Sequence, residues 1–164
     1  MNRRFMLMGA CALISACAIV PGENVLAPNS TLVVTRHADR EGASPDLSET
    51  GRARARALVA AVEELGVKHI YSPGIQRNLE TAAPLANALD LPVKRLPQEN
   101  PVPGLTERSA GTVAIWIGNK GNIRTIWEGL RLSDPAPLAY GDLHIIRSDE
   151  MGRVTVERRR YGPE

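Results

Sequence analysis

Cysteine, aromatic residues and an excess of charge are all scarce in this sequence. Cys11 and Cys17 are its only cysteines, so a domain formed by the later residues has no disulfide and no thiol nucleophile, which excludes cysteine phosphatase and thiol hydrolase chemistry. Aromatic residues make up 4% of the chain, and the loss of Arg3 and Arg4 from its 20 basic residues would leave 18, equal to the 18 acidic ones. Without a basic footprint or stacking platform, nucleic-acid binding is disfavoured.

A long apolar run is also missing after the N-terminus, so no later segment is expected to span a bilayer. At the N-terminus, Arg3 and Arg4 precede a short apolar stretch, which is typical of a signal peptide. The sequence Ile14-Ser15-Ala16-Cys17 resembles a bacterial lipobox, and predicts a signal peptide over residues 1–17, lipidation of Cys17 and a lipid-anchored protein of the bacterial cell envelope. The alternative is cleavage at Ala16-Cys17-Ala18 as an A-x-A site, which predicts a soluble periplasmic or secreted protein.

The rest of the chain has the composition of one globular domain, since 43% of the sequence is hydrophobic and 23% is charged. Residues 18–30 are rich in Pro, Gly and Asn and are predicted to form a tether, with the domain at 31–164. Short apolar runs at 32–34 and 112–117 are typical of strands buried on both faces. Strands alternate with helical segments through most of the chain, which predicts an α/β fold with a mainly parallel central sheet flanked by helices.

The other expected elements follow from apolar periodicity and from turn residues. Strands are predicted at 67–71, 92–96, 143–147 and 154–158, the last two as a hairpin at a sheet edge, and helices at 48–65, 75–89 and 123–130. Pro84 predicts a kink or a restart in the second helix. The segment 98–111 contains two prolines and a glycine close together and is predicted to be a loop. Arginines at positions 52, 54 and 56 predict a solvated face on the first helix.

Polar residues follow three of the predicted strands. Arg36 and His37 follow the first, the segment from Ser72 to Arg77 follows the second, and Asn119 and Lys120 follow the run at 112–117. Because the carboxyl ends of parallel strands meet at one edge of a sheet, we expect these residues to converge. Two arginine forks suit the oxygens of a phosphate, and a histidine between them could attack phosphorus or transfer a proton. The pattern therefore predicts a phosphate-ester site.

These residues resemble the signatures of the histidine phosphatase superfamily, the phosphoglycerate-mutase-like proteins. Thr35-Arg36-His37-Ala38 is similar to the family's R-H-G/A signature after the first strand. Residues 47–53, LSETGRA, are similar to its L-S-x-x-G-x-x-A helix start. Ser72, Arg77 and Thr81-Ala82 are similar to its S-x-x-x-x-R-x-x-x-T-A block. The three blocks keep the family's order and spacing across residues 31–89.

The resemblance implies a three-layer phosphoglycerate mutase-like domain with His37 as its nucleophile. His37 would form a phosphohistidine that water hydrolyses, while Arg36 and Arg77 bind the phosphoryl group. The implied substrate is a phosphorylated small molecule or a phospho-protein, and no metal or organic cofactor is implied. Mutase activity is disfavoured, since a chain of 164 residues leaves little material for loops that hold a transferable sugar phosphate.

The sequence departs from the family at Asn119, which stands where the family places a second histidine. A histidinium would donate a charged hydrogen bond to the phosphoryl oxygens, about 1.5–3 kcal/mol, whereas asparagine donates a neutral one, about 0.5–1.5 kcal/mol. Loss of one transition-state donor lowers turnover by roughly 100- to 1,000-fold. Two hypotheses follow: a weakened phosphatase, or a catalytically inactive phosphate-ester-binding pseudoenzyme of the cell envelope in which Asn119 still contacts phosphate.

Two further assignments stay open at this stage. Lys120, next to Asn119, could restore the missing positive charge. The general acid of the family lies in the loop after the third strand, where Glu99 is the nearest carboxylate and Glu107 the next. Asp39, beside the nucleophile, is a third alternative.

Overall fold

The computed structural model describes residues 24–164. The predicted signal peptide, including Cys17, and the first residues of the predicted tether lie outside the described residues. Within residues 24–164, no helix is long and apolar enough to cross a membrane. The elements, in chain order, are β1 (Ser30–Arg36), α1 (Glu49–Val62), the short 3-10 helix η1 (Glu63–Leu65), β2 (His69–Ser72), α2 (Gln76–Leu89), β3 (Val93–Arg95), α3 (Val102–Arg108), β4 (Val113–Gly118), α4 (Lys120–Gly129), β5 (Asp142–Ser148) and β6 (Val154–Arg160).

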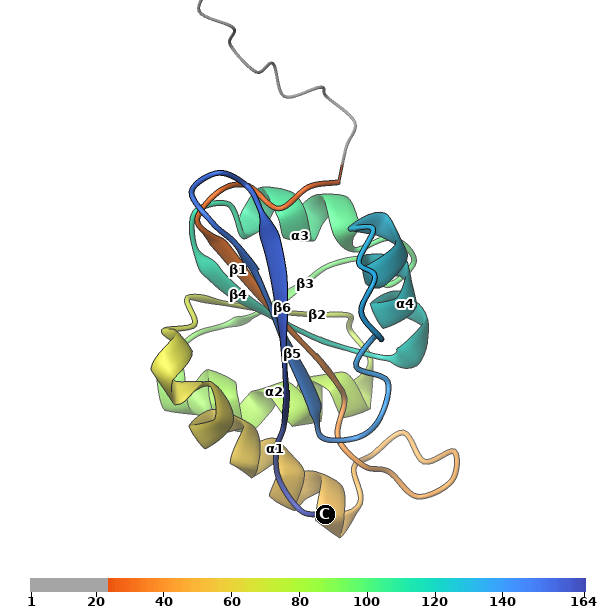
Figure 1. Ribbon diagram of the computed structural model, residues 1–164. Helices are drawn as coiled ribbons and strands as arrows, with labels where there is room; N and C mark the ends of the chain where they lie inside the picture. Colours follow the sequence, from red (N-terminus) through yellow and green to blue (C-terminus); the bar gives the residue numbers. More distant parts are fainter. Residues whose placement is uncertain (1–23) are drawn as a thin grey trace, which may run out of the picture.

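One six-stranded sheet forms the middle layer, with the strand order β3-β2-β4-β1-β5-β6. The pairs β1–β4, β2–β4 and β2–β3 are parallel, whereas β5 pairs antiparallel with β1 and with β6. Helices α1 and α2 cover one face of the sheet, and α3 and α4 cover the other (Figure 1). The expected three-layer α/β fold with a mainly parallel sheet is confirmed, as are the central strand near 112–117 and the edge hairpin.

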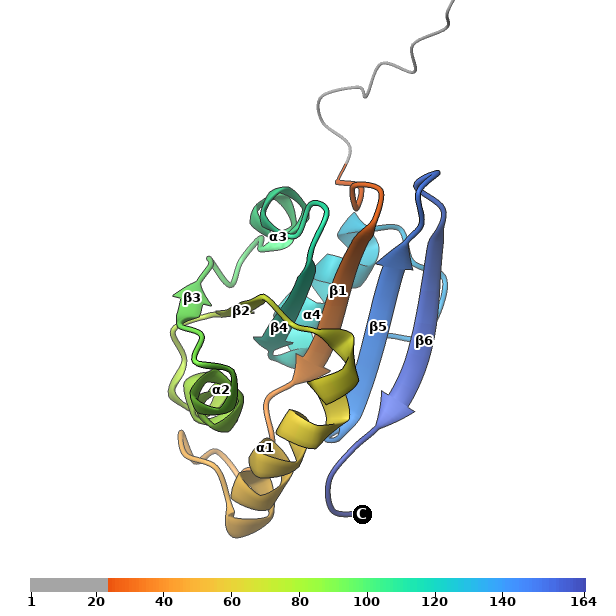
Figure 2. The ribbon, with the colours of Figure 1, turned by 90° about the vertical axis from the view of Figure 1, so that its left-hand side faces the viewer.

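The apolar runs in β1 and β4 supply both halves of the core. Leu32 and Val34 of β1 face α3 and α4, where they share a buried cluster with Trp116 and Trp127. Val33, between them, faces α1 and α2. Because successive strand residues point to opposite faces and both faces are covered, the middle of each strand is continuously apolar, at 32–34 in β1 and at 113–117 in β4. The two layers of helices seen in Figure 2 are the reason that the alternation typical of a half-exposed strand is absent here.

Two local expectations differ from the structure. Helix α2 is one continuous helix through Pro84, so the expected restart is absent. Pro84 is half-buried, so water can donate the hydrogen bond that its backbone nitrogen cannot. Helix α3 forms inside the segment 98–111, which was expected to be a loop. Its Pro103 lies in the first turn, where the backbone N–H has no helical partner in any case, and Val102 and Leu105 anchor the helix in the core.

The domain also begins earlier than Thr31, the expected boundary. Leu26 is only 2% exposed and belongs to the core cluster under α4. Its carbonyl accepts a hydrogen bond of 3.4 Å from the hydroxyl of Ser148. The packed part of the chain therefore includes residues that were assigned to the tether.

Candidate active site

The carboxyl ends of β1 and β4 place His37 and Asn119 side by side. Arg36 pairs with Gly118 in the parallel register of these strands. The backbone N–H of His37 donates to the carbonyl of Gly118 over 2.7 Å. The next residue on each strand, His37 and Asn119, therefore leaves the sheet at the same level, on strands about 4.8 Å apart.

Helix α2 brings Arg77 to the same edge, because polar side chains fasten its start to the end of β4. The hydroxyl of Ser72, at the end of β2, donates to the carbonyl of Ile117 over 2.9 Å. The side-chain amide of Asn78 donates to the same carbonyl over 3.1 Å. Asn78 follows Arg77 in α2, and Ser72 ends β2. The two hydrogen bonds therefore hold the start of α2, with Arg77, against the end of β4.

The imidazole of His37 is held in one tautomer. Its Nδ1 lies 2.8 Å from the carbonyl oxygen of Ala38. A carbonyl only accepts hydrogen bonds, so Nδ1 carries the proton and Nε2 carries the lone pair. Thr81 steadies this turn, since its hydroxyl accepts from the N–H of Ala38 over 2.9 Å and donates to the carbonyl of Arg77 over 2.7 Å. A buried imidazole with an unprotonated Nε2 has the lone pair that a nucleophile needs.

Arg77 is hydrogen-bonded to that lone pair. Its Nε donates to Nε2 of His37 over 3.1 Å. An electrophile that bonds to Nε2 must take over this hydrogen bond, and a phosphoryl group brings oxygens that accept it. Arg77 is thus within reach of the atoms attached to any phosphorus that His37 attacks.

Arg36 is fixed from a different part of the chain, the connection between α4 and β5. Its Cζ lies 3.9 Å from the ring centroid of Tyr140, and its Nη1 donates to the carbonyl of Leu138 over 3.1 Å. Among the described residues, the buried Nε of Arg36 has no hydrogen-bond partner. The ring of Tyr140 also meets that of His37 edge-on, with the centroids 5.7 Å apart. Sequence patterns gave no indication of Tyr140 as a site residue.

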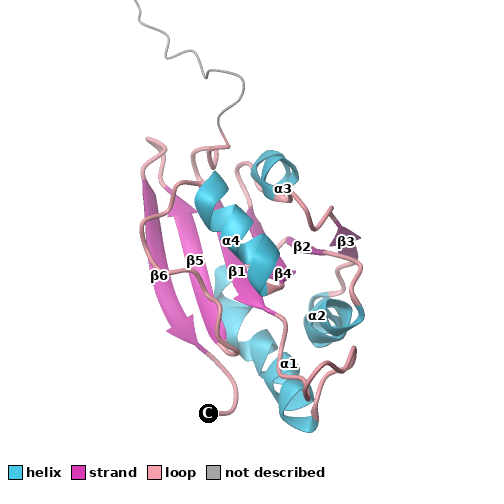
Figure 3. Ribbon diagram, turned by 90° about the vertical axis from the view of Figure 1, so that its right-hand side faces the viewer, coloured by secondary structure: helices cyan, strands magenta, loops and turns pink. Residues whose placement is uncertain are grey.

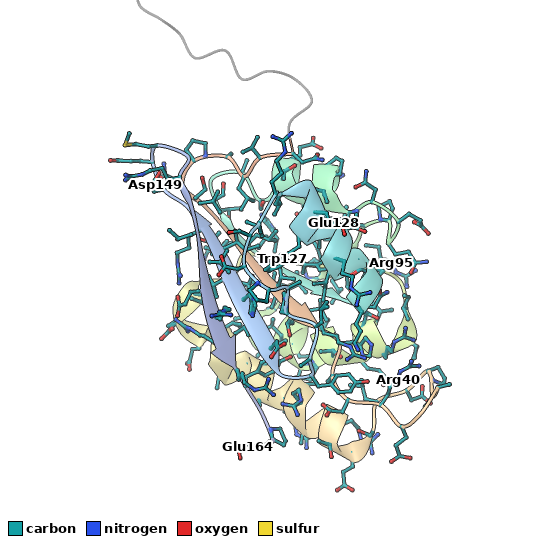
Figure 4. All side chains as sticks on the ribbon, turned by 45° about the vertical axis from the view of Figure 1, so that its right-hand side comes forward. Arg40, Arg95, Trp127, Glu128, Asp149 and Glu164 are labelled. Carbon is teal, nitrogen blue, oxygen red and sulfur yellow. The ribbon has the colours of Figure 1, made fainter. Side chains whose placement is uncertain are left out.

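Positive charge surrounds His37. Burial is the main cause that lowers the pKa of His37 to about 4, and the charges of Arg36, Arg77 and Arg40 lower it further, against the hydrogen bond to Ala38, which raises it. Arg40, a residue that the sequence-based site omitted, lies on the loop between β1 and α1 (Figure 4). Burial and the charge of Arg40 also lower the pKa of Arg77. The site holds a neutral imidazole in a positive field, which favours a dianionic ligand.

We expect the imidazole of His37 to titrate near pH 4 in the folded protein, well below its ordinary value of 6.5. Between these two values the unfolded chain binds a proton that the folded site refuses, so the stability present above pH 6.5 is lost as the pH falls towards 4. NMR titration of the His37 ring, with urea unfolding at several pH values, measures both effects. A His37 pKa at or above 6.5 would contradict the buried, cation-surrounded site.

Asn119 is the N-cap of α4. Its Oδ1 accepts from the backbone N–H groups of Gly121, at 3.0 Å, and Asn122, at 3.3 Å. The side chain of Asn122 in turn accepts from the N–H of Asn119 over 2.9 Å. The amide oxygen of Asn119 is therefore engaged in the helix, and only its NH₂ group is left to face a ligand. Lys120 is exposed in the first turn of α4, and the cations that act on the pKa of His37 are Arg36, Arg77 and Arg40.

The three carboxylates considered as general acids lie in different surroundings. The carboxylate of Asp39 is held by Arg54, with Nε 2.6 Å from Oδ2. Arg54 is only 4% exposed and its Nη1 donates to the carbonyl of Tyr161 over 2.6 Å, so the expectation of a solvated arginine face was wrong at this position. Glu99 lies in the loop after β3 and Glu107 in α3, and both are exposed. No contact of the described residues joins either of them to His37.

The helix start at residues 47–53 shapes the loop that follows His37. Both the N–H and the hydroxyl of Ser48 donate to the carbonyl of Asp39, over 2.9 and 3.2 Å. A Cβ on Gly51 would lie 2.0 Å from the same carbonyl oxygen, so only glycine lets α1 approach this closely. This second motif block is structural: it packs α1 against the backbone between His37 and Arg40.

In residues 24–164, no three His, Cys, Asp or Glu side chains gather closely enough to hold a metal ion. The side chains gathered near His37 are arginines, the amide of Asn119 and the ring of Tyr140. This composition suits an oxyanion ligand, because guanidinium groups match the oxygens of phosphate with paired donors.

Known structures share this fold. The chain is similar to the protein histidine phosphatase SixA, solved with tungstate, with a TM-score of 0.60 and 17% identity over 79% of this chain and 96% of that one. It is also similar to a mycobacterial glucosyl-3-phosphoglycerate phosphatase solved with inorganic phosphate (TM-score 0.58, 15% identity, 82% and 98% covered). A third is YhfR from Bacillus stearothermophilus (TM-score 0.60, 19% identity, 77% and 94% covered).

The sequence comparisons give a narrower result. No curated protein sequence matches the chain significantly. A family model matches residues 32–115, the region from β1 through α3 to the first half of β4, which includes His37 and Arg77. Since this match covers half of the chain and the fold agrees with it, the protein belongs to the histidine phosphatase superfamily, branch 1.

Proposed function

We propose that this protein hydrolyses a phosphomonoester or a phospho-protein through a phosphohistidine intermediate at His37. The observation that carries the proposal is the state of Nε2: its lone pair is fixed by the Nδ1 contact with Ala38 and lies 3.1 Å from Nε of Arg77. Arg36 precedes His37 in the chain, and its Nε, which has no hydrogen-bond partner among the described residues, would supply a second donor. Neutral nucleophile and cationic donors are the two things that phosphoryl transfer without a metal needs.

The chemistry then takes two displacements. The phosphoryl oxygens accept the hydrogen bond of Arg77, the freed Nε2 forms a bond to phosphorus, and the ester P–O bond breaks, with the leaving oxygen gaining a proton from solvent. Water next attacks phosphorus, the N–P bond breaks, and its electron pair returns to Nε2 as inorganic phosphate leaves. Arg36, Arg77 and Arg40 stabilise the negative charge that the three equatorial oxygens carry in both transition states.

The structural relatives support this range of substrates. SixA is described as a protein histidine phosphatase and was solved with tungstate, and the mycobacterial relative acts on glucosyl-3-phosphoglycerate and was solved with phosphate. Two substrate classes, phospho-protein and small phosphate ester, are therefore carried by the same fold. We further propose that Cys17 anchors the protein in the cell envelope, where its partner would be a phosphorylated molecule of that compartment.

A second candidate function is phosphate-ester binding without turnover, and Asn119 is the observation that favours it. The amide oxygen of Asn119 is engaged by α4, and its NH₂ group donates only a neutral hydrogen bond. Binding through Arg36 and Arg77 would survive this loss, whereas stabilisation of the transition state would weaken.

Turnover of p-nitrophenyl phosphate by the purified protein tests the proposed function. This ester is the right probe because p-nitrophenolate leaves without protonation, so its hydrolysis does not depend on a general acid. We expect hydrolysis at a measurable but slow rate and inhibition by tungstate. If calorimetry detects tungstate binding but no p-nitrophenol is released, the protein binds phosphate esters without hydrolysing them.

A further inference from the structure

The connection between α4 and β5 contributes to the site a residue that none of the motif blocks contains. This connection runs past the outer strands to the start of β5, at the end of the sheet where β1 ends (Figure 3). Its Leu138 and Tyr140 contact Arg36 there. The guanidinium of Arg36 lies over the ring of Tyr140, with Cζ 3.9 Å from the centroid. We propose that Tyr140 is the positioning residue of this site: its ring holds the guanidinium of Arg36 in the plane that a phosphoryl group needs. The inference rests on the proposed function of His37 and Arg36.

The contacts of Arg36 show why such a platform is needed. Its Nη1 is held by the carbonyl of Leu138, but its buried Nε has no hydrogen-bond partner among residues 24–164. Burial is the main cause that lowers the pKa of Arg36, and the charges of Arg40 and Arg77 lower it further, against Tyr140 and Asp39, which raise it. A free guanidinium repelled by two others would turn away. The electron-rich face of Tyr140 attracts it and leaves the Nε edge free for a ligand.

Tyr140 also touches the nucleophile. Its ring meets the imidazole of His37 at 61°, with centroids 5.7 Å apart, in an edge-to-face contact. One side chain therefore contacts both the nucleophile and its neighbouring cation. A ring in this place sets the relation between the Nε2 lone pair and the donors of Arg36, and excludes water from one side of the imidazole.

The backbone of Tyr140 is itself fixed, which a platform requires. Asp142 accepts from the N–H of Ala139 over 2.9 Å and from Nη1 of Arg160 over 2.7 Å. Nη2 of Arg160 donates to the carbonyl of Tyr140 over 3.2 Å. The hydroxyl of Thr35, next to Arg36 in the sequence, donates to the carbonyl of Asp142 over 2.8 Å. The backbone on both sides of the Tyr140 ring is thus held by residues of β1, β5 and β6.

Stacking and hydroxyl chemistry make different predictions for substitutions at this position. Phenylalanine keeps the ring face and loses the hydroxyl, whereas leucine keeps apolar bulk and loses the ring face. If the ring is the platform, Tyr140→Phe keeps the function and Tyr140→Leu does not. If Tyr140 only fills space, Tyr140→Leu and Tyr140→Phe should have the same tungstate affinity and the same turnover.

The test compares the wild type with Tyr140→Phe, Tyr140→Leu and Tyr140→Ala, and with Ser133→Ala as a control at an exposed position of the same connection. Two quantities are measured: the dissociation constant for tungstate, and kcat/KM for p-nitrophenyl phosphate. We expect Tyr140→Phe to stay within about 3-fold of the wild type in both quantities, and Tyr140→Leu and Tyr140→Ala to lose roughly 10- to 30-fold. Ser133→Ala should match the wild type, and thermal melting shows whether each variant is folded.

Three results would overturn the assignment. Tyr140→Leu with wild-type tungstate affinity would show that no ring is needed, and this variant keeps the test decisive even if Tyr140→Ala does not fold. Tyr140→Phe as impaired as Tyr140→Leu would move the role to the hydroxyl. A wild-type protein that does not bind tungstate would remove the ligand that Arg36 is positioned for. Wild-type binding without turnover would contradict hydrolysis and leave the role of Tyr140 standing, so the two proposals fail separately.

Discussion

Replacement of His37 by asparagine is expected to lower the hydrolysis of p-nitrophenyl phosphate by roughly 1,000-fold or more, to the level of the uncatalysed reaction in the assay. Asparagine resembles the near half of the imidazole, and its NH₂ group can still donate to the carbonyl of Ala38, so the turn after β1 should keep its shape. What it lacks is the Nε2 lone pair that Arg77 now contacts. Turnover should therefore vanish while the arginines still bind tungstate.

The matched control is His69→Asn. His69 begins β2, at the opposite end of that strand from Ser72 and the site, and its Nδ1 lies 3.3 Å from Nζ of Lys94 at the surface. The same chemical change there should leave turnover as it is. Substantial activity in His37→Asn would contradict nucleophilic catalysis by this residue.

Asn119→His is expected to raise kcat by roughly 10- to 100-fold, because a histidinium beside His37 would add a charged donor to the transition state. The same substitution should lower the free energy of unfolding by about 1 kcal/mol, since the side chain that caps α4 is lost. The register of β1 and β4 is the reason to expect any gain, because it places position 119 at the level of the nucleophile. Steady-state kinetics and urea unfolding measure the two effects.

Asn119→Ser separates these two effects. Serine is as good an N-cap as asparagine, but it brings no positive charge. We expect wild-type stability from this variant and no increase in kcat. If Asn119→His showed the loss of stability without any gain in kcat, asparagine at this position would not be what limits turnover.

The fold followed from the sequence where burial alone decides the structure. The strands β1 and β4 lie under helices on both faces, so the middle of each strand is a run of apolar residues, and this pattern is typical of parallel sheets. The continuous helix through Pro84 and the short helix α3 were missed for a different reason. Tertiary packing outweighs local preference there, since Val102 and Leu105 hold α3 against the core whatever its prolines favour.

Site residues that lie next to strand ends could be predicted, and those delivered by irregular segments could not. Arg36, His37 and Asn119 were placed by the rule that polar residues after parallel strands converge. Tyr140 lies more than 100 positions from His37, in a connection without periodicity, and only the three-dimensional packing joins them. Arg40 was within the opening motif region, but a charged loop residue carries no sign of where its side chain will point.

Arg54 illustrates the limit of charge patterns. Three arginines at alternate positions of a helix usually indicate a solvated face, because long charged side chains rarely lie in the interior. Here the carboxylate of Asp39 and the carbonyl of Tyr161 satisfy the buried guanidinium. Both partners are far from Arg54 in the sequence, so its burial could not be foreseen from α1 alone.

The central claim is that a phosphoryl group is attached to His37 during turnover. Mixing the protein with p-nitrophenyl phosphate, quenching within one turnover in alkali, which preserves phosphohistidine, and analysing the digested peptides by mass spectrometry tests this directly. We predict that the peptide containing His37 gains the mass of one phosphoryl group, and that the same peptide of His37→Asn does not. Rapid release of p-nitrophenol with no phosphoryl group on His37, or with the group on another residue, would contradict the account.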